Sequence, residues 1–349
     1  MKRLCRKKLT GWRLHKNLSM QQLADEMTRA GHPITKAAIS AFEKGITRPL
    51  PETINQLAHA LEIDPDELSE SDFDLDFVVF HECETMQPAM RRAIQAKIEW
   101  LAHRREKLYE LSGISRPSWE LNPFAISSLK ETYKLADQVR ESLGLDTAGE
   151  IHFAKAIELK GIQVLELDDS PKFHGAAARS SNGVPFLIIQ RGKQEYYSHR
   201  FELARELALL LLDPASPVDA KAFAQSFAGE LTLPSEFVIE KLGKRILAVD
   251  FQLLGKLRKQ YRIPLEIWLR RAYDCGVIRD SVYRSSVQRL SQVERRADKW
   301  EPKPLPERSS IDLRLAATAF AKGTMSSEEV RTWVGVPGEK LKQLHGLNP

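Results

Sequence analysis

The strongest constraint on the fold of this chain is a pair of short helical segments with a break between them, in residues 18–45. Ser19 and Thr35 each stand where a segment begins, and such side chains accept a hydrogen bond from a free backbone N–H of the first turn. Gly31 and Pro33 interrupt the chain between the segments, and Gly45 ends the second one. Apolar residues recur at helical spacing: Leu23, Met27, Ile39, Phe42, Ile54, Leu57, Ala58 and Leu61. The pattern predicts an all-α bundle of five short helices over residues 9–68.

This bundle resembles the DNA-binding domain of the Xre/Cro helix-turn-helix family, which has a lambda-repressor-like fold. The resemblance rests on LSMQQLA at 18–24, on TKAAISAFEKG at 35–45 and on the ending LEIDPDEL at 61–68. The turn between the paired helices is a few residues longer than in lambdoid repressors, and Met20 stands where glutamine is usual. We place this domain at residues 1–68. The plainer alternative is a helical bundle whose basic face is only solvated.

Carried over position by position, the resemblance implies a DNA-reading face on the second of the paired helices. Lys36, Ala37 and Ala41 would face base edges in the major groove, and Lys44 and Arg48 would contact phosphates. The full set of expected DNA-binding positions is Gln21, Thr35, Lys36, Ala37, Ser40, Ala41, Lys44 and Arg48. The expected partner is double-stranded operator DNA.

Charge is distributed unevenly along the chain. Residues 1–16 hold seven Lys or Arg and no acid, whereas residues 66–76 hold six acids and no base. We expect the basic stretch Arg3–Lys8 to contact DNA phosphates, and Arg13 and Glu43 stand where related repressors have an internal ion pair. The net charge of +5 permits nucleic-acid binding without proving it.

The composition fits a cytoplasmic protein of two or three domains. The chain has 349 residues, of which 42% are hydrophobic and 28% charged, as is ordinary for a soluble protein. No apolar run reaches the length of a membrane span, and the N-terminus lacks the apolar core of a signal peptide. The three cysteines are far apart in sequence and fit neither a disulfide framework nor a CxxC metal site. We therefore expect reduced thiols and no association with a membrane.

Residues 69–116 predict an acidic linker followed by a short strand and a long helix. Residues 77–80 are expected to form the strand and residues 87–111 the helix. The apolar positions of the helix form a stripe: Met90, Ile94, Ile98, Leu101, Leu108 and Leu111. Such a stripe either pairs two chains in a coiled coil or packs on its own domain, and the sequence leaves both open.

A mixed α+β domain is predicted for residues 117–296. Helices are expected at 129–143 and 150–159, each followed by a glycine, and residues 162–167 alternate like a half-buried strand. Strands at 175–179 and 184–190 are separated by Ser181, Asn182 and Gly183, and Asn-Gly is a strong hairpin signal. These strands should lie beneath the helix that contains Phe201.

The stretch HRFELARELALLLLDP at 199–214 has the pattern of a metallopeptidase active-site helix without the metal ligands. The HExxH motif places two histidines four apart on one helical face, with a glutamate beside the first. In that register Arg205 and Leu209 occupy the histidine positions, and Glu206 occupies the glutamate position. Arginine has no lone pair and leucine has no donor atom, so neither can hold Zn²⁺.

Together with FAQSFAGELTLP at 223–234, this stretch resembles the ImmA/IrrE family of zinc peptidases, which implies a zincin-like fold. In that family the third zinc ligand is a glutamate three residues before the first alanine of the second motif, and Lys221 occupies that position. The resemblance therefore implies a pseudopeptidase with no metal, no cofactor and no enzymatic activity. We expect Arg205 and Lys221 to pair with Glu206 or to hold an anionic ligand. His199 does not have the spacing of a metal pair with Arg205, and we interpret it as a capping or surface histidine.

The C-terminal part of the chain predicts two pairs of helices with a linker between them. The first pair, at 253–261 and 264–276, should carry a basic outer face made of Lys256, Arg258, Lys259, Arg262, Arg270 and Arg271. The linker is expected at 297–307 and the second pair within 309–347. Ser326 should cap the second helix of that pair, and Gly335 to Pro337 should end it. We group residues 297–349 as one unit.

As a whole, the chain resembles fused Xre-family regulators that carry an ImmA/IrrE domain. This resemblance implies a bacterial or phage transcription regulator, a repressor that binds DNA as a homodimer and whose metal-less domain binds a ligand or a protein. The alternative is an antitoxin, whose C-terminal domain neutralises a cognate toxin while its N-terminal domain represses the shared operon. The least favoured alternative is an active peptidase that uses other ligands.

Overall fold

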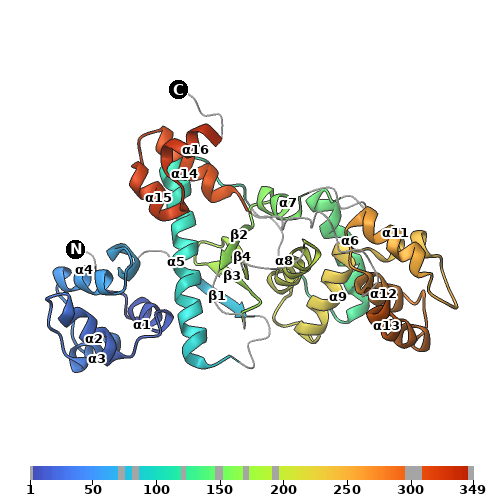
Figure 1. The fold of residues 1–349 in the computed structure, drawn as a ribbon, viewed down its shortest axis with the longest axis horizontal. Coiled ribbons are helices and arrows are strands. Elements are labelled where there is room, and N and C mark those ends of the chain that lie inside the picture. The colour runs from blue at the N-terminus through green and yellow to red at the C-terminus, as the bar shows by residue number, and fades with distance from the viewer. Residues whose placement is uncertain are drawn as a thin grey trace.

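The computed structural model describes residues 3–69, 75–80, 86–118, 123–145, 152–167, 173–190, 196–294 and 309–344. Its elements gather into an N-terminal helical bundle, a sheet between helical layers, a helical group at the far end and a C-terminal helical group (Figure 1). No helix in these ranges is both long enough and apolar enough to cross a membrane.

The N-terminal bundle has the five helical segments that the sequence predicts. They are α1 (Arg6–His15), α2 (Met20–Arg29), α3 (Lys36–Lys44), α4 (Pro51–Ala60) and the 3-10 helix η1 (Pro65–Leu68). Both predicted caps are confirmed, because Ser19 Oγ accepts a hydrogen bond from Gln22 N at 3.1 Å and Thr35 Oγ1 accepts one from Ala38 N at 3.1 Å. Gly45 ends α3 in the left-handed conformation, with φ of 70°.

A four-stranded sheet forms the middle of the molecule, with strand order β1-β3-β4-β2. The strands are β1 (Leu75–Phe80), β2 (Gln163–Leu167), β3 (Gly175–Ser180) and β4 (Pro185–Gln190). Strands β1 and β4 both pair with β3 in antiparallel fashion, while β2 pairs with β4 in parallel. The predicted Asn-Gly hairpin is confirmed, since Gly183 has φ of 78° in the turn between β3 and β4.

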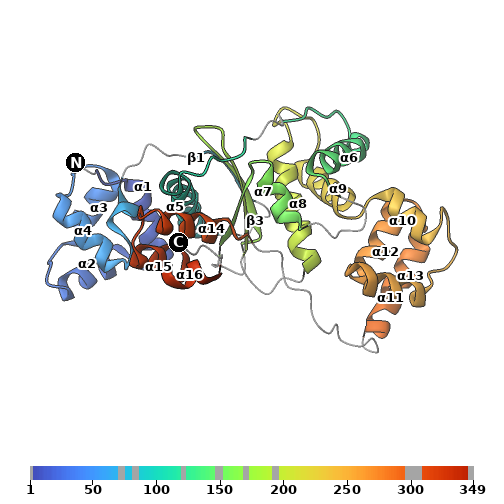
Figure 2. The ribbon, with the colours of Figure 1, turned by 90° about the horizontal axis from the view of Figure 1, so that it is seen from above.

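The sheet is covered on both faces. The long helix α5 (Pro88–Ser112) lies on one face and α8 (Tyr196–Leu211) on the other (Figure 2). Ile98 of α5 shares one apolar cluster with Leu165, whereas Leu207 of α8 shares another with Val164. The prediction of a half-buried strand at 162–167 was therefore wrong, because the two helical layers bury residues on both of its faces.

Further helices pack on α8 and continue its layer. They are α6 (Thr132–Leu143), α7 (Phe153–Leu159) and α9 (Ala220–Thr232), together with the 3-10 helix η3 (Leu129–Glu131). The predicted helix at 129–143 is confirmed, and Gly144 ends it with φ of 64°. The predicted helix at 150–159 begins at Phe153 in the described part of the chain.

At the far end, four helices surround the fully buried Trp268. They are α10 (Ser235–Leu242), α11 (Phe251–Tyr261), α12 (Leu265–Asp274) and α13 (Asp280–Glu294). The sequence predicts α11 and α12. The predicted linker at 297–307 lies outside the described residues.

The C-terminal group contains three helices where the sequence predicts two. They are α14 (Ile311–Ala321), α15 (Ser327–Val334) and α16 (Gly338–Leu344). Ser326 caps α15 and Gly335 ends it with φ of 75°, as expected. The chain then resumes as α16, because Leu341 is fully buried in the same apolar cluster as Leu315 of α14.

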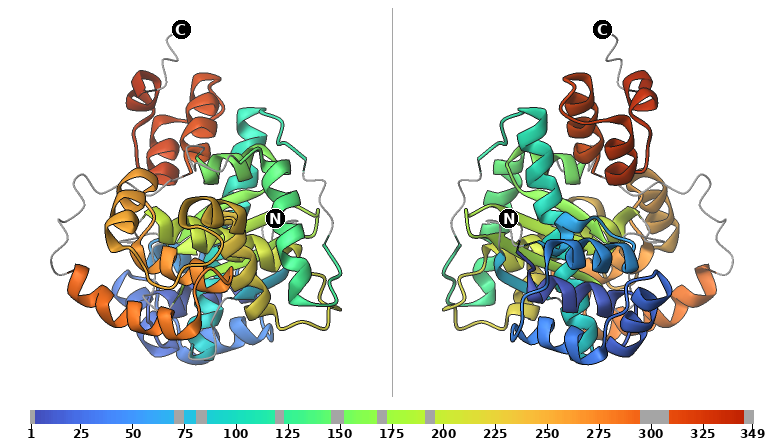
Figure 3. Two further views of the ribbon diagram at one scale, coloured as in Figure 1. Left: turned by 90° about the vertical axis from the view of Figure 1, so that its right-hand side faces the viewer. Right: turned by 90° about the vertical axis from the view of Figure 1, so that its left-hand side faces the viewer.

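Helix α5 connects these groups, and its apolar stripe is used within the chain. Figure 3 shows the blue N-terminal bundle and the red C-terminal helices near opposite ends of the teal α5. Near the C-terminal end of α5, the buried Arg105 pairs with Asp312 of α14 and lies 3.7 Å from Glu158 of α7. Arg105 Nη2 also donates to the carbonyl oxygen of Val164 in β2 at 3.1 Å. One side chain thus ties α5, α7, β2 and α14 together.

Candidate nucleic-acid interface and buried carboxylate

Helix α3 has one face in the core and one face in solvent. Ile39 and Phe42 are buried, as predicted. On the opposite face, four of the expected DNA-binding residues of α3 and its flanks are exposed and two are half-buried. The exposed ones are Thr35, Lys36, Ala37 and Lys44, and the half-buried ones are Ser40 and Ala41. This arrangement leaves the polar face of α3 free to enter a groove.

Two further expected DNA-binding residues lie outside α3. Arg48 is exposed in the turn after α3. Gln21 is exposed at the start of α2, but its amide Nε2 donates to Asp25 Oδ1 at 2.9 Å. One of the two N–H donors of the Gln21 amide is thus used within the helix, which leaves the other for a phosphate.

A buried ion pair fixes α3 against α1. Arg13 Nε and Nη2 donate to the two carboxylate oxygens of Glu43 at 2.6 and 2.9 Å, and Arg13 Nη1 donates to Leu18 O at 2.8 Å. Bidentate pairs of this kind add geometric specificity. The expected internal ion pair is thus confirmed.

The basic stretch Arg3–Lys8 is only partly available to DNA. Lys8 was expected to contact phosphate, but it is buried and its Nζ donates to Ser69 O at 2.9 Å. This expectation was wrong because α1 begins at Arg6, which turns Lys8 toward the end of the bundle. Arg6 and Lys7 are exposed, and Arg6 Nη1 donates to the Lys44 carbonyl oxygen at 3.3 Å.

With this geometry in view, the comparisons with known proteins are informative for one part of the chain. Residues 12–68 match the family HTH_3, described as Helix-turn-helix. The N-terminal bundle is a helix-turn-helix domain. Such domains are typical of DNA-binding transcription regulators. No curated protein and no solved structure matched the chain.

The second candidate site is the carboxyl group of Glu206 on α8. Glu206 is completely buried, and within the described residues neither of its oxygens has a hydrogen-bond partner. Its carboxyl presses against Gly175 of β3, where a Cβ atom would lie 2.4 Å from Oε1. Burial raises the pKa of Glu206 well above its usual value of 4.5, the nearby Glu202 adds to the rise, and Arg205 opposes it. The group therefore favours the protonated, uncharged form.

The predicted pairing of Glu206 with Arg205 and Lys221 was wrong. Arg205 Nη1 donates instead to Glu202 Oε1 at 3.0 Å, one turn earlier on α8. Lys221 is exposed at the start of α9. Consecutive residues on a helix point roughly 100° apart, so the turn that directs Glu206 to the sheet directs Arg205 elsewhere.

The two remaining α8 positions of interest are also buried. Leu209 lies in the apolar cluster beneath α8. His199 was interpreted as a capping or surface residue, which was wrong, because α8 begins at Tyr196 and His199 is 4% exposed within its first turn. His199, Glu202 and Glu206 are spaced three and four apart, which places them on one helical face. The sequence could have revealed this shared face from the spacing. The three residues do not form a metal site, because the described residues contain no group of three His, Cys, Asp or Glu that could hold a metal ion.

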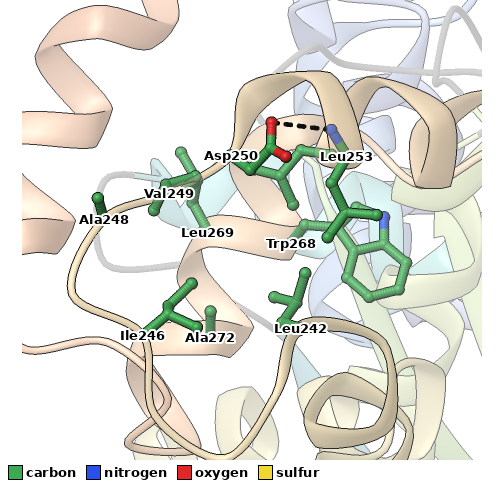
Figure 4. Close-up of a pocket in the computed structure, with 10 residues that line it drawn as sticks. Leu242, Ile246, Ala248, Val249, Asp250, Leu253, Trp268, Leu269 and Ala272 are labelled. Atoms are coloured by element: carbon green, nitrogen blue, oxygen red, sulfur yellow. Dashed lines mark hydrogen bonds between the residues drawn. The ribbon is translucent and has the colours of Figure 1, made fainter.

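A small apolar pocket of about 80 Å³ lies among α10, α11 and α12 (Figure 4). Leu242, Ile246 and Leu269 are among the side chains that line it, and the indole ring of Trp268 lies beside them. Asp250 is its acidic lining residue, but the carboxylate caps α11 by accepting hydrogen bonds from Gln252 N and Leu253 N. Sites for drug-sized ligands are usually about 300–1,000 Å³. The size and the apolar lining of this pocket suit at most a small apolar group.

The basic outer face expected on α11 and α12 lacks one of its members. Arg271 is 3% exposed, its Nε donates to Leu233 O at 2.9 Å, and its Nη2 pairs with Glu230 of α9. The neighbouring Arg270 has a half-exposed side chain and pairs with Asp274 at 3.0 Å. Arg271 therefore joins α12 to α9 and was wrongly assigned to the surface.

Proposed function

We propose that this protein is a DNA-binding transcription regulator that reads operator DNA with α3 as a homodimer and acts as a repressor. The main observation behind this proposal is the structure of α3. Its ends are capped, Ile39 and Phe42 bury one face in the core, and the opposite face is open to solvent. The helix-turn-helix match over residues 12–68 supports this proposal.

Base reading on this helix would depend mainly on Lys36. A lysine can donate to the acceptors of guanine, and the methyl groups of Ala37 and Ala41 suit contact with thymine methyls. Lys44 and Arg48 are placed for phosphates, which carry no sequence information. Because one hydrogen-bonding side chain gives modest specificity, two copies on a palindrome would supply useful affinity, which supports the homodimer.

Two lysine variants test this proposal. The probe is a duplex that the full-length protein selects from a random library, compared with a scrambled duplex by fluorescence anisotropy. Lys36→Ala should lose roughly 1–3 kcal/mol on the selected duplex and relax preference at one base pair. Lys44→Ala should weaken both duplexes alike, because a phosphate contact is independent of sequence.

The control is Arg284→Ala, which removes an exposed arginine paired with Asp280 on the distant α13. It should bind like the wild type. Equal weakening of both duplexes by Lys36→Ala would refute the docking of α3, and a wild-type protein that selects no duplex would refute the function.

We further propose that the α8 region contributes by binding rather than by cleavage. The positions that would hold zinc are Arg205, Leu209 and Lys221, which supply no metal-ligating atom at neutral pH. Glu206 is sealed against Gly175, away from any bulk water that it could activate. A pulldown from the native host and a binding test with small molecules together distinguish the modes of action. A stable complex with a small toxin favours the antitoxin alternative, whereas a small molecule that stabilises the protein and releases the selected duplex favours a sensor.

A further inference from the structure

We infer that the edge formed by α1 and the N-terminal half of α5 is a second DNA contact, which holds phosphates that flank the bases facing α3. This inference rests on the proposed DNA binding. Its starting point is a groove of about 500 Å³ between the two helices, here called the α1–α5 groove. The groove is lined by Arg6, Lys7, Thr10, Glu43, Arg92, Gln95, Ala96 and Glu99.

The acids of this groove are engaged by the protein itself, whereas its cations are available. Glu43 accepts hydrogen bonds from Nε and Nη2 of Arg13, and the buried Glu99 accepts a hydrogen bond from Gln95 at 3.2 Å. Arg6, Lys7 and Arg92 are exposed and form no ion pair with any described residue. The groove therefore offers three positive charges to a negatively charged partner.

The groove continues the phosphate-facing end of α3. Arg6 Nη1 lies 3.3 Å from the Lys44 carbonyl oxygen, so the α1 side of the groove touches the residue proposed to contact phosphate. In Figure 1, α3 and the N-terminal end of α5 both lie along the lower edge of the molecule. A duplex lying along this edge would meet α3 first and the α1–α5 groove next.

The N-terminal end of α5 is suited to an anion. This helix is 25 residues long and begins at Pro88, so its unpaired N–H groups and its dipole favour negative charge. Arg92 stands in the second turn. The adjacent Arg91 already stacks on Phe80, with its guanidinium 5.0 Å from the ring centroid. Arg92 is therefore the α5 cation that is free to bind phosphate.

The two contacts are rigidly linked, so their binding free energies should add. Gly11 of α1 lies directly against Ala96 of α5, and Trp12 meets Trp100 edge to face with centroids 5.6 Å apart. Because α3 is locked to α1 by Arg13 and Glu43, the three helices form one body. Binding of DNA to both contacts therefore carries no entropy cost of closing a loop between them.

The test uses the selected duplex in two lengths, one trimmed to the selected core and one with flanking base pairs on both sides. Arg92→Ala and Lys7→Ala should each weaken binding to the long duplex and to a scrambled long duplex by the same factor. Each should also reduce the slope of log K against log salt by about 0.9, the value for one phosphate. On the trimmed duplex both variants should match the wild type, and Arg284→Ala should match it on every duplex.

Hydroxyl-radical footprinting gives an independent readout, since Arg92→Ala should lose protection of the flanks and keep protection of the core. Wild-type salt slopes for both variants on the long duplex, or equal losses on both lengths, would overturn the flanking contact and leave the α3 proposal standing. If Lys36→Ala proves neutral while Arg92→Ala weakens binding, the α3 proposal fails and the groove contact stands. A wild-type protein that binds no duplex overturns both.

Discussion

At the scale of single residues, the buried carboxyl of Glu206 makes the stability of the folded protein depend on pH. Arg205, the cation that lowers its pKa, is bonded to Glu202, and within the described residues neither oxygen of the Glu206 carboxyl has a hydrogen-bond partner. In an unfolded chain the group ionises with a pKa near its usual value of 4.5, whereas burial raises the pKa in the folded state. Between these two values the folded state binds more protons than the unfolded state. The contribution of Glu206 to stability is therefore fully present below pH 4.5 and is lost as pH rises through the folded-state pKa.

Glu206→Gln should separate this ionisation from packing. The amide has nearly the same size but cannot ionise, so the midpoint of thermal unfolding of the variant should fall less than that of the wild type between about pH 5 and about pH 8. Differential scanning fluorimetry across that range measures the difference. Glu240→Gln, at an exposed position on α10, should follow the wild type. Parallel curves for Glu206→Gln and the wild type would show that Glu206 is charged in the folded state.

Single residues also show where sequence reasoning reaches its limit. The spacing of Ile39 and Phe42 within α3 correctly predicted which face is buried, because helical geometry fixes the angles between neighbours. The same geometry does not reveal which distant residue arrives at a given face. Arg271 meets Glu230 from another helix and was misassigned for this reason, whereas Arg205 was misassigned although its partner Glu202 lies only three residues away on the same helix.

At the scale of elements, the contact between α1 and α5 depends on a glycine. Gly11→Ala should destabilise the protein by roughly 1–3 kcal/mol, as overpacking does, because the new Cβ would lie 2.0 Å from the Ala96 Cβ. Ala96→Gly in the same chain should restore most of the loss. Urea unfolding measures both variants.

The matched control for this prediction is Gly255→Ala in α11. Nothing lies within 4 Å of a Cβ at that position, so the variant should gain the helical propensity of alanine, up to about 1 kcal/mol. If Gly11→Ala gains stability as Gly255→Ala does, the close approach of the two helices is incorrect.

Among elements, those with local signals were predicted and those made by packing were not. The capped helices, the Asn-Gly hairpin and the long α5 all have residues that specify them locally. In contrast, α16 follows Gly335 and Pro337, which are stop signals, and it depends on the burial of Leu341. The burial of β2 depends on two helices that lie far from it in sequence.

At the scale of the whole molecule, buried charge attaches the C-terminal helices to α5. Asp312 of α14 accepts from Arg104 and Arg105, and these arginines hold the pKa of Asp312 below its usual value against the effect of burial. Removal of one partner from a buried pair usually costs about 3–5 kcal/mol. Asp312 is partly exposed and Glu158 remains 3.7 Å from Arg105, so we expect a loss at the lower end of that range.

Asp312→Ala should therefore destabilise the protein by roughly that amount and make the junction between α14 and α5 sensitive to protease. Urea unfolding and limited proteolysis measure the two effects. Asp280→Ala removes an exposed Asp-Arg pair on α13 and should cost at most about 0.5 kcal/mol. Equal small losses in both variants would mean that the C-terminal helices are held by apolar contacts alone.

The position of α5 restricts how this protein can exchange parts with its relatives. A chimera joined near residue 69 would leave Gly11 and Trp12 without the helix surface that they pack on. A junction after residue 112 would transfer α5 with the N-terminal bundle and remove Ile94 and Ile98 from the cover of the sheet. Neither half therefore recombines freely, and under the role proposed for α3 a new DNA specificity should arise by point substitution on that helix rather than by replacement of the domain.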